Sequence, residues 1–154
     1  MKISIIAVGR LGRSPEAALA AGYAERATAS GRSLGLGPVE VIEVEARKPG
    51  KAAEAEVLVA QIGDAHLVAC DEHGAALTSR DFAARIAALR DQGVRRLAFV
   101  VGGADGLDPA LLGAARERLA FGPQTWPHAL VRAMLAEQVY RAVTILAGSP
   151  YHRD

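Results

Sequence analysis

Apolar residues in this chain gather in short runs that are separated by longer segments with three- and four-residue periodicity. Residues 3–8 and 96–101 are nearly continuous apolar runs, as expected for strands that are covered on both faces of a sheet. Residues 39–45 alternate apolar and acidic side chains, which predicts a strand with one hydrated face near a sheet edge. Residues 65–70 form a further apolar run, closed by an expected turn at 71–74. The pattern therefore predicts four strands.

The segments between these runs carry helix signals. Ser14-Pro15-Glu16 reads as an N-cap, a first-turn proline and an acid that complements the helix dipole, so we expect a helix from residue 15 to about residue 28. Further helices are expected at residues 52–62, at 80–91 with Thr78 or Ser79 as the cap, from Asp108-Pro109 onward, and at about 127–146. Strands alternating with helices indicate an α/β protein with a mostly parallel sheet flanked by helices, and residues 1–154 fit a single domain.

Two turns are candidates for ligand binding. The glycine-rich segment 102–106 directly follows the most apolar predicted strand, where open α/β sheets commonly bind ligands. It matches neither the dinucleotide nor the P-loop pattern, so a ligand-binding turn and a plain tight turn before the next helix remain equally open. The second segment, 122–127, is stiffened by two prolines and holds the single tryptophan, Trp126. On its residues alone, this segment is better interpreted as a structural loop whose tryptophan covers the core.

Composition narrows the classes of function. The formal net charge of +1 excludes a polycation, although a local basic patch remains open. The single cysteine, Cys70, excludes an intrachain disulfide and favours a reducing cytoplasm. The apolar run near the N-terminus is too short to span a membrane. The four histidines show no metal-ligand spacing, so no metal site is expected, and no Gly-x-Ser-x-Gly elbow places a nucleophile.

The last predicted helix and the residues after it hold much of the polar chemistry. The helix has a wide apolar face, which either seals the core or pairs with its copy in a dimer. Glu137 and Arg141 form an i,i+4 pair, which is expected to orient another group if it is buried. The chain then closes on Tyr151-His152-Arg153-Asp154, an unusual concentration of aromatic, imidazole, guanidinium and carboxylate groups.

Five sequence blocks, taken in order, resemble one known family. They are Val-Ala-Cys-Asp-x-x-Gly at 68–74, Val-Val-Gly-Gly-x-x-Gly-Leu at 100–107, Trp-Pro-His-x-Leu-Val-Arg at 126–132, Glu-Gln-Val-Tyr-Arg-Ala at 137–142 and Pro-Tyr-His-Arg at 150–153. Over essentially the whole length, the chain resembles the ribosomal RNA large subunit methyltransferase H family of the SPOUT methyltransferases. The resemblance implies an α/β fold with a deep C-terminal trefoil knot, which no periodicity reveals, and a homodimer with cofactor sites near the subunit interface.

The resemblance also implies an activity. It implies S-adenosylmethionine-dependent methylation of N3 of a pseudouridine in 23S rRNA, in a large-subunit stem-loop near the decoding centre, with the assembled ribosome as substrate in the cytoplasm. No membrane or metal partner is implied. Two other classes remain open from the residues: a non-catalytic ribosome- or nucleotide-binding α/β module, and a flavodoxin-like redox domain, for which residues 9–14 offer a poor phosphate loop.

Site residues follow from the same resemblance. The implied cofactor contacts are Cys70, Gly103, Gly122, Pro123, Gln124, Thr125, Trp126 and Pro127. The family more often has leucine where Cys70 stands, and cysteine keeps that contact apolar. The tail is implied to reach the active site, with a proton-transfer or base-orienting role for His152, a phosphate or carbonyl contact for Arg153, and stacking or hydrogen bonding for Tyr151. Independently of the resemblance, five basic residues on expected loops are either phosphate contacts or ordinary solvated charges: Arg10, Arg13, Arg47, Lys48 and Lys51.

Overall fold

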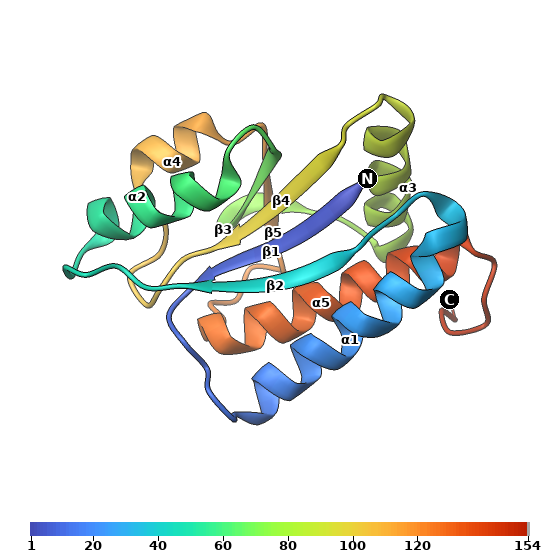
Figure 1. Ribbon diagram of the computed structural model, residues 1–154, viewed down its shortest axis with the longest axis horizontal. Coiled ribbons are helices and arrows are strands. Elements are labelled where there is room, and N and C mark those ends of the chain that lie inside the picture. Colours follow the sequence, from blue (N-terminus) through green and yellow to red (C-terminus); the bar gives the residue numbers. More distant parts are fainter. Residues whose placement is uncertain (154) are drawn as a thin grey trace.

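The computed structural model describes residues 1–153, which form one five-stranded sheet with helices on both faces (Figure 1). The strands are β1 (Lys2–Val8), β2 (Val39–Val44), β3 (His66–Ala76), β4 (Arg96–Val101) and β5 (Glu117–Ala120). Neighbouring strands pair in parallel in the order β2-β1-β4-β3-β5. The predicted α/β class and parallel sheet are confirmed, and β2 lies at a sheet edge as its alternating pattern predicts. The trefoil knot stays a prediction.

Five α-helices connect the strands, and each begins close to where the sequence predicts it. They are α1 (Pro15–Gly31), α2 (Lys51–Ile62), α3 (Ser79–Asp91), α4 (Pro109–Ala114) and α5 (His128–Leu146), with a short 3-10 turn at Arg32–Leu34. The side chains of Ser14, Thr78 and Asp108 accept backbone N–H bonds at the starts of α1, α3 and α4. These bonds satisfy donors that the first helical turn leaves unpaired.

The sheet separates two apolar layers, which explains why β1 and β4 are apolar throughout. Successive side chains of a strand point to opposite faces, so Ile3 and Ile5 pack under α1, α3 and α5, whereas Ile6 and Val8 pack under α2 and α4. Figure 1 shows α1 and α5 lying side by side on one face and α2 and α4 on the other. Both faces of the central strands are therefore buried, so a ligand is expected to bind at an edge of the sheet.

The prediction of four strands is wrong, because β5 is a fifth. Its sequence, Glu-Arg-Leu-Ala, has too few apolar residues to give a strand pattern, and it pairs only with β3 at the sheet edge. The expected turn at 71–74 is also wrong in form. There β3 bulges between Cys70 and Ala75 and then pairs with β5 again. A Cβ on Gly74 would lie 2.6 Å from the backbone nitrogen of Leu119, so the bulge fits against β5 because residue 74 is glycine.

An ion-pair cluster holds the start of β5 in place. The Glu117 carboxylate accepts hydrogen bonds from Arg85 of α3 at 2.7 and 2.8 Å and lies 2.6 Å from Nε2 of His66. The hydrogen bonds from Arg85 hold the pKa of the Glu117 carboxyl below its ordinary value, while burial opposes the shift and His66 supports it. Side chains from α3, β3 and β5 thus hold the edge strand together.

The lowered pKa of Glu117 predicts an acid-dependent loss of stability. Because an unfolded glutamate has a pKa of about 4.3, the charged carboxylate stabilises the fold fully above about pH 4.3, and this stabilisation is lost as the pH falls through the lower folded-state pKa. We expect Glu117→Gln to flatten the fall of the free energy of unfolding in this acidic window. Urea unfolding between roughly pH 3 and 6 measures it. The exposed Glu25→Gln variant is the control, and identical pH profiles for the wild type and Glu117→Gln would contradict the prediction.

Candidate functional site

The carboxyl ends of β3, β4 and β5 meet at one edge of the sheet and surround a cavity of about 240 Å³. Its walls are the glycine turn after β4, the bulge of β3 and the loop between β5 and α5. Open parallel sheets commonly bind ligands at this position, where strand order changes direction. The cavity is therefore the first candidate for a binding site.

The glycine turn presents backbone rather than side chains to the cavity. The Gly106 N–H donates to the Gly103 carbonyl at 3.1 Å and closes the turn. A Cβ on Gly102 would lie 2.7 Å from the backbone carbonyl carbon of Gly106, so only glycine fits there. Gly102 and Gly103 line the cavity, where a ligand can approach their backbone closely.

The loop from residue 121 to residue 127 forms the opposite wall and is held by its own hydrogen bonds. Trp126 Nε1 donates to the Phe121 carbonyl at 3.1 Å, and the Thr125 hydroxyl donates to the Glu72 carboxylate of the β3 bulge at 3.4 Å. The interpretation that Trp126 covers the core is wrong, because its side chain is 40% exposed and lines the cavity. The loop thus spans the cavity mouth from β5 to β3.

Cys70 supplies an apolar contact at the base of the cavity. Burial raises the pKa of its thiol to about 12, so the group stays protonated at neutral pH. A neutral thiol behaves as a small hydrophobe. This environment agrees with the predicted apolar role of Cys70 and gives it no nucleophilic one.

The structure brings most of the predicted cofactor residues together. The cavity lining contains Cys70, Gly103, Gly122, Gln124, Thr125 and Trp126. Pro123 and Pro127 belong to the same loop but do not line the cavity. Sequence reasoning missed other lining residues, namely Asp71, Glu72, Asp105, His128 and Val131. The one sequence signal for Asp71 and Glu72 is that they directly follow Cys70.

The predicted catalytic tail lies elsewhere in the same chain. The Tyr151 hydroxyl donates to Glu137 at 3.0 Å, and its ring packs edge-on against Tyr140, with ring centroids 4.7 Å apart. Glu137 is nine residues from the start of α5, or roughly 14 Å along the helix axis. Residues 147–153 follow the far end of α5 (Figure 1), and Tyr151, His152 and Arg153 do not line the cavity.

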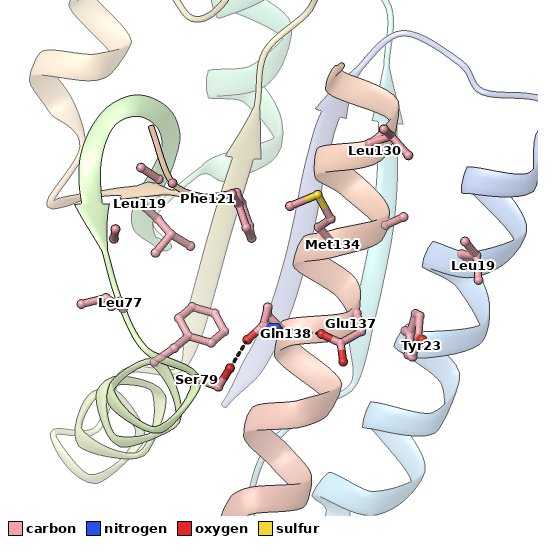
Figure 2. Close-up of a pocket in the computed structure, with 15 residues that line it drawn as sticks. Leu19, Tyr23, Leu77, Ser79, Leu119, Phe121, Leu130, Met134, Glu137 and Gln138 are labelled. Atoms are coloured by element: carbon pink, nitrogen blue, oxygen red, sulfur yellow. Dashed lines mark hydrogen bonds between the residues drawn. The ribbon is translucent and has the colours of Figure 1, made fainter. Parts of the chain in front are cut away.

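A second, largely apolar cavity of about 620 Å³ connects these two regions (Figure 2). It extends from Phe121 and Gly122, in the loop that also borders the first cavity, along α5 to Glu137 and Gln138. The Ser79 hydroxyl donates to the Gln138 side chain at 2.9 Å across its polar end. Its rim carries large exposed apolar side chains: Leu19 at 50%, Leu77 at 41% and Leu130 at 37% exposure.

Arg132 on α5 is fully buried, which is rare for a charged residue. Its guanidinium donates to the carbonyls of Val8 and Gly9 and to the Glu43 carboxylate, the last at 3.1 Å. The same Glu43 oxygen accepts the Leu11 N–H at 2.9 Å. Burial lowers the pKa of Arg132, and Glu43 opposes that shift. Arg132 therefore fastens the start of α5 to the ends of β1 and β2.

The basic residues chosen from the sequence lie on two loops at this same sheet edge. Arg10 and Arg13 follow β1, and Arg10 pairs with Glu45 at 2.9 Å. The second loop follows β2 and carries Arg47, Lys48 and, at the start of α2, Lys51. All five side chains belong to exposed residues. The sheet edge at the carboxyl ends of the strands therefore has two parts. One part, after β1 and β2, is cationic, and the other contains the cavity.

Among residues 1–153, no three His, Cys, Asp or Glu side chains gather into a group that could hold a metal ion. In the same part of the chain, no helix is both long and apolar enough to cross a membrane.

Comparison with known proteins identifies the family of this chain. Residues 1–152 match the family described as "Predicted SPOUT methyltransferase". The ribosomal RNA large subunit methyltransferase H of Phenylobacterium zucineum (strain HLK1) is 73% identical over 154 residues, covering 100% of both chains. The protein of that name from Caulobacter vibrioides (strain ATCC 19089 / CIP 103742 / CB 15) is 69% identical, covering 100% of this chain and 99% of the relative. This chain therefore belongs to the ribosomal RNA large subunit methyltransferase H family of the SPOUT methyltransferases.

Solved structures support the fold. A probable methyltransferase from Bordetella pertussis Tohama I has a TM-score of 0.54 at 18% identity, covering 92% of this chain and 96% of that chain. A putative methylase family protein from Neisseria gonorrhoeae also has a TM-score of 0.54, at 15% identity, covering 99% of this chain and 86% of that chain. The arrangement of sheet and helices thus recurs in methylase-like proteins of distant sequence.

Proposed function

We propose that this protein methylates N3 of a pseudouridine in 23S rRNA, in a large-subunit stem-loop near the decoding centre, using S-adenosylmethionine. Its proposed substrate is the assembled ribosome in the cytoplasm. The names of its curated relatives support methylation of large-subunit rRNA. The observation that carries the proposal is the cavity between the glycine turn and the loop after β5, which gathers six of the eight residues expected to contact the cofactor.

The cavity fits this cofactor chemically. Backbone at Gly102, Gly103 and Gly122 offers hydrogen-bonding groups for an adenine edge, and Cys70 offers an apolar surface. Acidic side chains but no lysine or arginine line the described cavity, which suits a ligand that carries a sulfonium cation. At about 240 Å³ it is smaller than the roughly 300–1,000 Å³ of typical ligand pockets, so part of the ligand would sit at its open mouth. When bound, S-adenosylmethionine supplies the methyl group for transfer to a ring nitrogen.

The tail residues supply the groups that act on the nucleobase. Because N3 carries a proton in a neutral ring, a residue must help that proton leave or stabilise the charge that remains. We assign this role to His152 and a phosphate or carbonyl contact to Arg153. Burial, together with hydrogen bonds to Tyr23 and Glu137, raises the pKa of Tyr151, so its phenol stays neutral. Tyr151 therefore stacks and donates a hydrogen bond rather than removing a proton.

A homodimer brings the tail and the cavity together. Within one chain they are separated along α5, so we propose that the tail of one protomer completes the cavity of its partner. The apolar cavity shown in Figure 2, with its exposed leucines, is continuous with the loop after β5 and forms part of the proposed interface. The proposal includes the C-terminal trefoil knot and places the cationic loops after β1 and β2 against rRNA phosphates.

Calorimetry separates this proposal from its two rivals. Purified protein is titrated with S-adenosylmethionine, FMN and ATP in parallel. We expect saturable binding of S-adenosylmethionine alone. Binding of FMN alone would favour the redox domain, and binding of ATP alone would favour the nucleotide-binding module. If the protein binds S-adenosylmethionine but does not methylate rRNA, the result favours a non-catalytic binding module.

Gly102→Ala is expected to weaken binding of S-adenosylmethionine about 10–100-fold. The added methyl group collides with the backbone of Gly106 and displaces the turn, at a cost of about 1–3 kcal/mol. Gly113→Ala on α4 is the matched control, because a Cβ there meets no atom within 4 Å. Calorimetry measures both affinities. Wild-type affinity in Gly102→Ala would show that the ligand does not depend on this turn.

A further inference from the structure

The Glu137 carboxylate is the common acceptor for the groups that hold the tail. One of its oxygens, Oε1, accepts hydrogen bonds from Nε and Nη2 of Arg141, the former at 2.9 Å, and from the Tyr151 hydroxyl at 3.0 Å. The other oxygen accepts from the Gln138 amide at 2.8 Å. The Glu137 side chain is only 17% exposed, so this pair is not an ordinary surface ion pair. Both carboxylate oxygens are therefore occupied by contacts within one small cluster.

Helix stability alone does not explain this cluster. Exposed i,i+4 ion pairs stabilise a helix only slightly, and partly buried pairs lose much of their attraction to desolvation. Buried ion pairs can often be replaced by apolar residues of similar volume without loss of stability. What the charged pair adds is directional contact with residues 151 and 152.

Arg141 extends the cluster from Glu137 to His152. Its guanidinium carbon lies 4.9 Å from the centre of the Tyr151 ring, and its Nη1 lies 3.3 Å from Nδ1 of His152. A guanidinium can only donate hydrogen bonds, so Nδ1 of His152 must be the acceptor. In the tautomer whose Nδ1 accepts a hydrogen bond, the ring N–H is on Nε2.

We propose that Glu137 and Arg141 are positioning residues that hold the tail and fix His152 as a hydrogen-bond donor through Nε2. This inference rests on the proposed function. It selects the base-orienting role of His152 over that of proton acceptor. His152 donates to a carbonyl oxygen beside N3, while the N3 proton passes to water. The S–CH₃ bond then breaks as the N3–CH₃ bond forms, leaving the thioether product and a neutral N-methyl base.

Substitution of the cluster separates positioning from folding. We expect Glu137→Gln and Arg141→Met to lower kcat about 10–100-fold, because small misplacement of a reacting group costs up to this factor. The affinity for S-adenosylmethionine is expected to be unchanged, and sedimentation checks that a lower kcat does not come from loss of the dimer. Arg141→Lys keeps the charge but loses the planar fork, so its kcat should lie between those of the wild type and Arg141→Met. The matched control is Glu56→Gln, on the exposed face of α2.

Nitrogen-15 NMR of the imidazole gives a readout that a merely structural role would not move. In the wild-type dimer near neutral pH, Nδ1 of His152 should be unprotonated and Nε2 protonated; His152→Asn identifies the signals. In Arg141→Met, which no longer donates to Nδ1, the two tautomers should mix. A protonated Nδ1 in the wild type, an unchanged tautomer in Arg141→Met, or a wild-type kcat in Glu137→Gln would each overturn the inference. The inference would also be overturned if kcat fell only in proportion to the fraction of folded protein that is lost, as measured by circular dichroism.

A truncation after Pro150 distinguishes this inference from the function beneath it. If the truncated chain methylates rRNA normally, the tail has no catalytic role, and the proposed function fails at that point. If truncation abolishes methylation but Glu137→Gln and Arg141→Met do not lower it, only the positioning inference fails.

Discussion

Truncation of the chain after Pro150 lowers the methylation rate by an expected 10²–10⁴-fold, the range that positioned proton-transfer and charge-stabilising groups typically supply. The missing segment carries Tyr151, His152 and Arg153; Asp154 lies outside the described residues. Cavity residues are untouched, because the tail packs on α5 and does not line the cavity. Calorimetry with S-adenosylmethionine and sedimentation should therefore give wild-type values, and radiolabelled methyl transfer to ribosomes measures the rate.

A mixed dimer supplies the sharper control. The truncated chain keeps its cavity, and Gly102→Ala keeps its tail, so each homodimer should be weakly active. If one protomer's tail completes its partner's cavity, dimers formed from both variants should recover activity at one of their two sites. No recovery in verified mixed dimers would contradict the arrangement, as would full activity of the truncated chain alone.

Arg132→Met is expected to lower the free energy of unfolding by about 3–5 kcal/mol, the usual cost of removing one partner from a buried charged network. Methionine fills similar space but donates no hydrogen bond. The carbonyls of Val8 and Gly9 then lose their hydrogen-bond donor, and the Glu43 carboxylate loses its paired cation. Since Arg132 also fastens α5 to the end of β1, the wall of the cavity at His128 and Val131 should loosen too.

Chemical denaturation measures this effect, with two graded controls. Arg132→Lys keeps the charge but reaches fewer of the three acceptors, so its loss should be smaller. Glu43→Gln keeps an oxygen for the Leu11 N–H and has a side chain that is 31% exposed in the wild type, so its loss should be about 1 kcal/mol. Equal stability of Arg132→Met and the wild type would show that the buried guanidinium does not hold these strands.

Sequence pattern revealed the elements whose signals are local. Ser14 and Asp108 cap helices because each short polar side chain stands directly before a proline and an amphipathic segment. The long apolar runs of β1 and β4 likewise follow from burial on both faces. By contrast, β5 carries no such signal. Its strand form depends on pairing with β3 and on the contacts of Glu117 with Arg85 and His66.

The site was accessible from the sequence only in part. The glycine turn after β4 was identified from its position, but residues alone left binding and structure equally open. The residues around Trp126 indicate a core position, because no local signal shows that its side chain borders a cavity at three strands. Burial of Arg132 is likewise a tertiary property, since its acceptors lie over 80 residues away in the chain. The catalytic role of the tail residues is predicted from the family resemblance alone. Their distance from the cavity is visible only in the structure.

The most direct test of the central claim is methylation of ribosomes from cells that lack this gene. Purified protein is incubated with those ribosomes and S-adenosylmethionine, and nucleosides of the 23S rRNA are analysed by mass spectrometry. The account predicts one added methyl group, on N3 of one pseudouridine, present with the wild type and strongly reduced with Gly102→Ala when S-adenosylmethionine is held near the wild-type Kd. Unmethylated rRNA, or a methyl group on any other atom or nucleoside, would contradict it.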